Sequence, residues 1–107
     1  MTMPADGVFA ALADPTRWRV LSLLAERGEG TATSLAGELP VSRVAVVKHL
    51  AVLDRAGLVE GRRVGREVRY TVRTGPLGET ARWMAGVASQ WDDRLAAIRR
   101  MAEQRPS

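Results

Sequence analysis

The spacing of apolar residues changes at Gly57, and this change limits the folds that the chain can adopt. Before Gly57, apolar residues recur at the four-then-three spacing of one helix face: Val46, Leu50 and Leu53. After it, apolar residues alternate with charged or polar ones, as in a strand: Val68, Tyr70 and Val72. Ser42 suits the cap of a helix reaching Ala56, and Gly65 permits a turn between strands. The chain is therefore predicted to join a helix directly to a β-hairpin.

Two helices are predicted nearer the N-terminus. The first covers 7–13. Asp14 suits the N-cap of the second helix and Pro15 its first position, where the missing proline amide would have had no partner. Gly28 is expected to end this helix just after Arg27. Its predicted buried side consists of four residues: Trp18, Val20, Leu21 and Leu24.

A third helix is expected between these and the hairpin. Thr33 is its predicted cap, and it should stop before Pro40, whose ring disfavours the helical conformation of the preceding residue. Its predicted buried residues are Leu35, Ala36 and Leu39. Because only a short turn separates it from the helix that Ser42 caps, the two form a predicted helix-turn-helix.

A long amphipathic helix is predicted over about 77–103, after a break at Gly75 and Pro76. Its apolar residues recur at alternating spacings of four and three: Leu77, Ala81, Met84, Ala88, Trp91, Leu95, Ile98 and Ala102. A domain of this size is too small to cover so long a seam, so a second copy of the chain is the simplest partner. The predicted homodimer contacts are Phe9, Leu77, Met84, Trp91, Leu95 and Ile98.

A membrane surface is the alternative partner for this helix, which also has a basic side: Arg82, Arg94, Arg99 and Arg100. Acidic residues interrupt that side: Glu79, Asp92, Asp93 and Glu103. No apolar run in the sequence approaches the ~18 residues that cross a bilayer, and the first residues do not resemble a signal peptide. We therefore expect no membrane partner and a cytoplasmic protein.

The composition is that of one folded domain. Of its 107 residues, 46% are hydrophobic and 26% are charged, as in an ordinary folded protein. A chain of this length can build one hydrophobic core but not two. We expect a single domain over 1–107, with a core at about 9–75 and a dimerisation helix at about 77–103. The predicted fold class is mainly α (α+β), a winged helix-turn-helix with about five helices and a two-stranded β-hairpin.

The outward side of the helix that Ser42 caps carries the candidate contacts to double-stranded DNA. With Val46, Leu50 and Leu53 inward, helical geometry turns another set outward: Arg43, Val44, Val47 and Lys48, with Ser42 at the start. An arginine in the first turn suits a bidentate contact to guanine, and exposed valines suit thymine methyl groups. The alternatives are valines that pack under the hairpin and an arginine that is merely solvated.

Four arginines are concentrated on the hairpin: Arg62, Arg63, Arg66 and Arg69. Such a hairpin, or wing, can contact the phosphate backbone or enter a narrow minor groove. The formal net charge of +4 agrees with a polyanionic partner. The alternative is that these charges only prevent pairing with other strands, and it is stronger for Arg69 than for Arg66 at the predicted tip.

The sequence offers little for catalysis. It has no cysteine, which excludes disulfides and thiolate metal sites. His49 is the single histidine and is expected to pack in the core, while adjacent Asp92 and Asp93 diverge by about 100° on a helix. Phosphate-binding loops and nucleophile motifs do not occur. We therefore expect no enzyme, no cofactor and no metal site.

In combination, several short stretches resemble the ArsR family of winged-helix repressors. They are Ala11-Leu-Ala-Asp-Pro-Thr-Arg17, Ser42 through Lys48-His49-Leu50 with Leu53, Ala56-Gly-Leu-Val59, and Arg63-Val-Gly-Arg66 before Tyr70. The resemblance covers roughly 9–72. It implies a dimeric bacterial transcription regulator whose first and last helices form the dimer. It also implies an inverted-repeat operator and, frequently, autoregulation.

The chain departs from the metal-sensing members of that family. They carry a Cys-x-Cys pair at the start of the third helix, and the matching residues here are Thr31 and Thr33. The family's other metal site uses histidines with carboxylates on the last helix, which has no histidine here. Val44 and Val47 stand where the family often has proline and serine. The resemblance thus implies a member without the cysteine site, and it does not supply the operator sequence.

Other functions remain open from the sequence. A winged helix that binds a protein through its valine-bearing helix, with no specific DNA target, is the main rival. For regulation, a small apolar ligand between the dimer helices near Trp83 and Trp91 is compatible with the sequence, but no residue specifies it. Repression governed only by the abundance of the protein is equally compatible.

Overall fold

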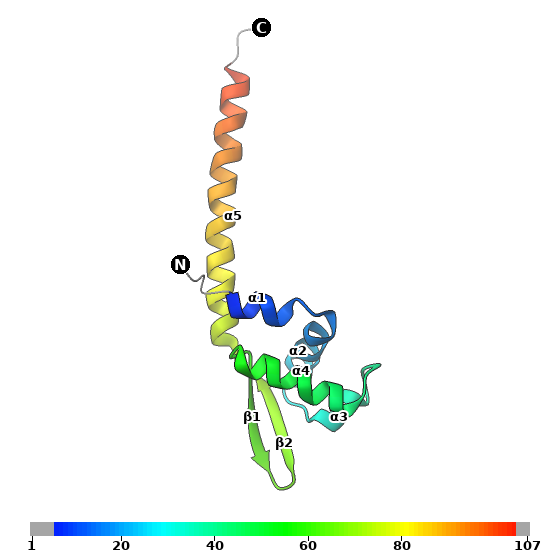
Figure 1. The fold of residues 1–107 in the computed structure, drawn as a ribbon. Coiled ribbons are helices and arrows are strands. Elements are labelled where there is room, and N and C mark those ends of the chain that lie inside the picture. The colour runs from blue at the N-terminus through cyan, green and yellow to red at the C-terminus, as the bar shows by residue number, and fades with distance from the viewer. Residues whose placement is uncertain (1–5, 105–107) are drawn as a thin grey trace.

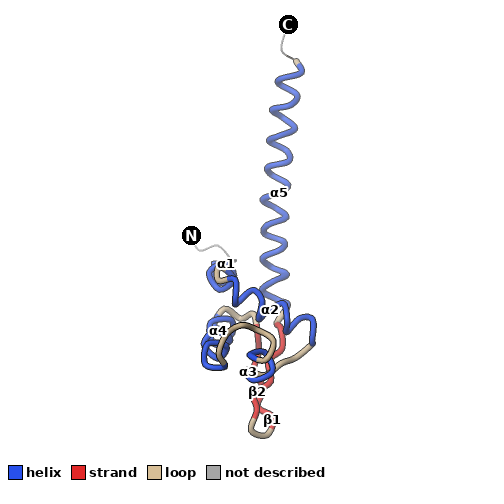
Figure 2. Tube along the Cα trace, turned by 90° about the vertical axis from the view of Figure 1, so that its right-hand side faces the viewer, coloured by secondary structure: helices blue, strands red, loops and turns tan. Residues whose placement is uncertain are grey.

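The computed structural model describes residues 6–104 and contains the predicted winged helix-turn-helix, with five helices and one antiparallel hairpin (Figure 1). The elements in chain order are α1 (Asp6–Leu12), α2 (Pro15–Arg27), α3 (Ala32–Ala36), α4 (Arg43–Arg55), β1 (Val59–Val64), β2 (Glu67–Val72) and α5 (Thr74–Glu103). The helices α1 to α4 gather at the base of α5, and the hairpin extends from the same region in the opposite direction (Figures 1 and 2).

The core lies between α2, α3, α4 and the base of the hairpin. Its largest fully buried side chains are Val20, Leu24, Leu35, Val46, Leu50, Leu53, Leu58 and Val59. The predicted inward face of α4 is thus confirmed. After α4, Gly57 adopts a φ of 75°, and its N–H and that of Leu58 donate to the carbonyls of Asp54 and Leu53. These two bonds end the helix and lead the chain into β1.

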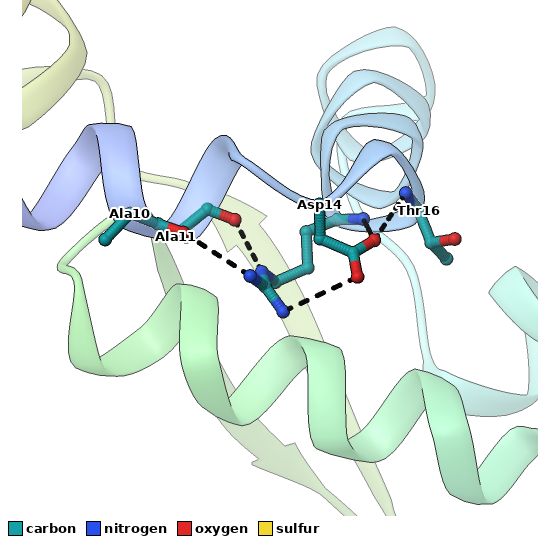
Figure 3. Close-up of polar contacts among 5 residues, drawn as sticks. Ala10, Ala11, Asp14 and Thr16 are labelled. Carbon is teal, nitrogen blue, oxygen red and sulfur yellow. Dashed lines mark hydrogen bonds and ion pairs between the residues drawn. The ribbon is translucent and has the colours of Figure 1, made fainter.

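The junction of α1 and α2 is held by two reciprocal caps (Figure 3). Oδ1 of Asp14 accepts from the backbone N–H groups of Thr16 at 2.7 Å and Arg17 at 3.3 Å. The Arg17 guanidinium reaches back and donates to the carbonyls of Ala11 and Ala10 in the last turn of α1. Hydrogen bonding by the Thr16 amide lowers the pKa of Asp14 below its ordinary value. The motif at 11–17 therefore fixes α1 against α2.

Both ends of α3 and the start of α5 differ from the prediction. Helix α3 is capped by Thr31, not Thr33, because the side chains of Thr31 and Ser34 each accept from the other residue's backbone N–H. It ends at Ala36, so half-buried Leu39 packs on the core from the following turn. Helix α5 begins at Thr74 and includes Gly75 and Pro76 in its first turn. Proline is tolerated there because the first amides of a helix have no intrahelical partner.

Trp18 does not join the buried side of α2, contrary to prediction. Its side chain is 57% exposed, while Val20, Leu21 and Leu24 are buried. Helical geometry places Trp18 roughly a third of a turn from the middle of the face that these three residues form. It lines a shallow apolar hollow together with other α2 residues, Val72 of β2 and Leu77 of α5.

The hairpin is tied to the helical part at its base. Tyr70 in β2 and Gly30 exchange two backbone hydrogen bonds, of 2.8 and 3.1 Å, so Gly30 forms an isolated antiparallel bridge to the hairpin. The Arg73 N–H donates to the carbonyl of Leu58. Gly65, with a φ of 63°, makes the turn at the far end. The wing is therefore anchored at one end and free at its tip.

We expect the stabilising effect of the Asp14 charge to depend on pH. Because the pKa is lowered on folding, the ionised carboxylate stabilises the folded protein above its unfolded pKa of about 3.9, and this is lost as the pH falls through the folded value. Urea unfolding of the protein and of its Asp14→Asn variant, from pH 7 to pH 3, tests this. Asparagine is the matched control because it caps helices without a charge. A stability difference that stays constant over this range would contradict the assignment.

Candidate nucleic-acid interface

The first turns of α4 present the predicted base-contacting residues to solvent. Oγ of Ser42 accepts from the Ala45 N–H at 3.1 Å and caps the helix. Arg43 and Lys48 are exposed, Val44 is 62% exposed and Val47 is 43% exposed. The predicted outward set is thus on the surface. Contact of these residues with DNA stays a prediction.

A hollow of about 300 Å³ lies between the helix-turn-helix and the wing. Its lining comes from α3 and the residue before it, from α4 and from the hairpin: Thr31, Ala32, Thr33, Arg43, Val47, Arg66, Glu67, Val68 and Tyr70. Two predicted DNA contacts from different elements, Arg43 and Arg66, therefore face one concave surface. Val47 lines it beside Val68 and Tyr70, so the alternative of a valine under the hairpin applies in part to Val47. Highly exposed Val44 is outside this lining.

The four wing arginines do not form one patch. Arg62 pairs with Arg69 across the hairpin and Arg63 pairs with Val68, and neighbouring pairs in an antiparallel ladder face opposite sides. Arg62 and Arg69 therefore share one face, Arg63 lies on the other and Arg66 is in the turn. The wing presents positive charge on both faces and at its tip.

Arg69 differs from the other three because acidic groups already compensate its charge. Its guanidinium lies 3.6 Å from a carboxylate oxygen of Glu29 and 3.7 Å from one of Glu67. Its side chain is half-buried, whereas Arg62, Arg63 and Arg66 are exposed. Glu29 precedes Gly30, which bonds to Tyr70, so the ion pair adds a second link between wing and helices. This arrangement favours a structural role for Arg69.

Arg43 has a partner that the sequence pattern did not reveal. Its Nε donates a hydrogen bond of 3.2 Å to Oγ1 of Thr33, the second residue of α3. Ten residues separate the two along the chain, so no helical or strand spacing indicates the contact. Thr31, the other residue at the family's cysteine positions, uses its hydroxyl to cap α3. Both threonine side chains therefore have assigned partners.

Helix α5 leaves most of its apolar face uncovered in a single chain. Thr80 is its one buried residue, and its hydroxyl donates to the Pro76 carbonyl at 2.7 Å. Past the base, α5 extends away from the other elements (Figures 1 and 2), and its large apolar side chains are 51–70% exposed: Met84, Trp91, Leu95, Ile98 and Met101. Four of these five, Met84, Trp91, Leu95 and Ile98, belong to the seam that the sequence predicted, and Met101 is an addition to it.

The two remaining predicted dimer residues lie near the base of α5. Phe9 of α1 is 38% exposed and packs edge-to-face on Trp83, with ring centroids 6.0 Å apart. Leu77 is half-buried against the protein's own core. Phe9 therefore keeps part of its surface exposed beside α5, while much of Leu77 is already used within the chain.

Over 6–104, no group of three or more histidine, cysteine, aspartate or glutamate side chains is placed to hold a metal ion. In the same part of the chain, none of the helices has the length and hydrophobicity to cross a membrane.

Known regulators of transcription are similar to this chain in sequence. A helix-turn-helix domain model matches residues 12–62. The chain is 31% identical over 90 residues to the transcriptional repressor SdpR of Bacillus subtilis, covering 84% of this chain and 99% of that protein. It is 36% identical over 100 residues to a probable mercury resistance operon repressor of Streptomyces lividans, covering 91% and 79% respectively.

The solved structures agree with the sequence relatives. An ArsR-like transcriptional regulator from Rhodococcus sp. RHA1 superposes with a TM-score of 0.85 at 48% identity, covering 96% of this chain and 94% of that one. The fold and these relatives thus define a DNA-binding winged helix-turn-helix regulator of transcription, a class whose members are not enzymes. Within this class, the chain belongs to the ArsR family.

Proposed function

We propose that this regulator is a homodimeric repressor that binds an inverted-repeat operator. The observation that carries the proposal is the exposed apolar face of α5. Its 30 residues make a helix roughly 45 Å long, and only its base packs on the rest of the chain. A two-fold axis beside α5 would cover the faces of both copies with one interface, to which Phe9 adds at the base. Two recognition helices related by that axis match an operator of inverted half-sites.

Within each half-site, α4 would enter the major groove with its first turn. Arg43 would read a guanine, Val44 would contact a thymine methyl group, and Lys48 would approach a phosphate. Arg62, Arg63 and Arg66 would hold the adjacent backbone from the two faces and the tip of the wing. Arg69 would contribute less to binding the DNA backbone, because Glu29 and Glu67 compensate its charge.

We also propose that the protein represses its own gene. The test of this proposal also separates DNA binding from the rival protein-interaction role. In a gel shift with the DNA upstream of the protein's own gene, we expect a complex that survives excess competitor DNA at 50 mM salt. Raising the salt to 200 mM should weaken it by at least about a thousandfold if six or more phosphates are neutralised. A scrambled duplex of equal composition is the control. Equal binding to both duplexes, or none, would favour the rival.

The proposed roles of Arg43 and Arg66 predict a loss of base discrimination for one variant and a loss of general DNA affinity for the other. Arg43→Ala should reduce discrimination at one base pair of the half-site by about 1–3 kcal/mol, since it removes a bidentate contact. Arg66→Ala should weaken binding to every sequence. It should also lower the salt slope, which is the slope of log affinity against log salt concentration, by about one per subunit. Arg19→Ala, which removes an equal charge from an exposed position on α2, is the matched control. Titrations against duplexes with single base-pair changes measure these effects, and an unchanged base preference for Arg43→Ala would exclude it as a base reader.

The dimer is tested at Leu95. Leu95→Glu places a charge on the exposed apolar face, so we expect light scattering to give the mass of one chain and binding to paired half-sites to become weak. Leu95 is outside the protein's own core, so circular dichroism should still show a folded protein. Gln90→Glu adds the same charge on another side of α5 and should leave the dimer intact. A Leu95→Glu protein that retains twice the chain mass would place the interface elsewhere.

A further inference from the structure

The side chain of Arg43 is held from a neighbouring helix before any DNA is bound. Its Nε donates to Oγ1 of Thr33 at 3.2 Å, which links the first residue of α4 to the second residue of α3. Within residues 6–104, Thr33 is the one protein group that hydrogen-bonds this guanidinium. The contact lies on the wall of the hollow that faces the wing.

We propose that Thr33 is a positioning residue that sets the orientation of Arg43 for base reading. The inference rests on the proposed role of Arg43. A guanidinium has five N–H donors, and the bond to Thr33 uses the one on Nε. The two terminal nitrogens keep the parallel pair of N–H groups that guanine O6 and N7 accept. The bond to Thr33 and a bidentate contact to guanine can therefore exist together.

Thr33 is suited to this role because its own position is fixed. The reciprocal cap between Thr31 and Ser34 sets the start of α3, with hydrogen bonds of 2.9 and 3.0 Å. Ala32 and Leu35 on either side are buried, so α3 cannot rotate without exposing them. Threonine is also branched at Cβ, which restricts its side-chain rotation. The acceptor for Nε is therefore held in place relative to α4.

Holding the arginine in advance should improve recognition of one base pair without changing general attraction to DNA. A free arginine loses much of its conformational freedom when it docks on a base, and a restrained one loses less. Immobilising such a side chain corresponds to about a 2- to 12-fold change in affinity. Attraction to phosphates depends on the charge, which the hydrogen bond leaves unchanged. Thr33 is thus expected to affect specificity and to leave the salt slope alone.

The test compares Thr33→Val, which keeps the branched shape and removes the hydroxyl, with Thr33→Ser, which keeps the hydroxyl. The probe is the duplex that the unsubstituted protein selects from random DNA, together with the same duplex changed at the guanine on which Arg43→Ala shows its effect. The quantity measured is the ratio of the two affinities. We expect Thr33→Val to lower this ratio about 2- to 12-fold and Thr33→Ser to preserve it. Binding to an unselected duplex and the melting temperature should not change.

Two controls make the test specific to Arg43. Thr33→Ala, a second way to remove the hydroxyl from this exposed position, should match Thr33→Val. In an Arg43→Ala background, Thr33→Val should have no further effect on the ratio, because its action requires the arginine. An unchanged ratio for Thr33→Val, or an equal loss in both backgrounds, overturns this inference alone. If Arg43→Ala itself leaves base preference unchanged, the proposed base reading fails, and this inference with it.

Discussion

The buried face of α4 fixes what the rest of the molecule can present to DNA. Val46, Leu50 and Leu53 have no exposed surface, so α4 cannot rotate about its axis without leaving cavities in the core. That rotation determines which residues point outward. Arg43 and Val44 are on the surface because these three residues are inside. The end of the helix is equally fixed, since Gly57 and Leu58 bond back to its last turn and direct the chain into the wing.

Local patterns in the sequence predicted most of this arrangement. The period of apolar residues identified the inward face of α4, and residue type alone identified Asp14, Gly28 and Ser42 as helix boundaries. The errors have local causes as well. Both Thr31 and Thr33 are acceptable caps, and only the reciprocal bonds with Ser34 decide between them. Proline breaks a helix in its interior but not in its first turn, and this moved the start of α5.

Such patterns could not predict contacts between residues that are far apart in the sequence. The bond between Arg43 and Thr33 and the ion pair between Arg69 and Glu29 join residues from separate elements. Each adds to the interpretation of an arginine that the sequence had proposed as a DNA contact. Arg43 is oriented by a neighbour, whereas Arg69 is largely compensated. The sequence located the basic residues, and the fold determines which of them remain available to a polyanion.

The proposed dimer connects α5 to the recognition helices, since the two-fold axis beside α5 sets the spacing of the two copies of α4. Selection of bound sequences from random DNA by the full chain tests this claim most directly. The account predicts two half-sites in inverted orientation, with their centres about 10–10.5 base pairs or a multiple of that distance apart. A single unpaired half-site, or two half-sites in direct repeat, would contradict it.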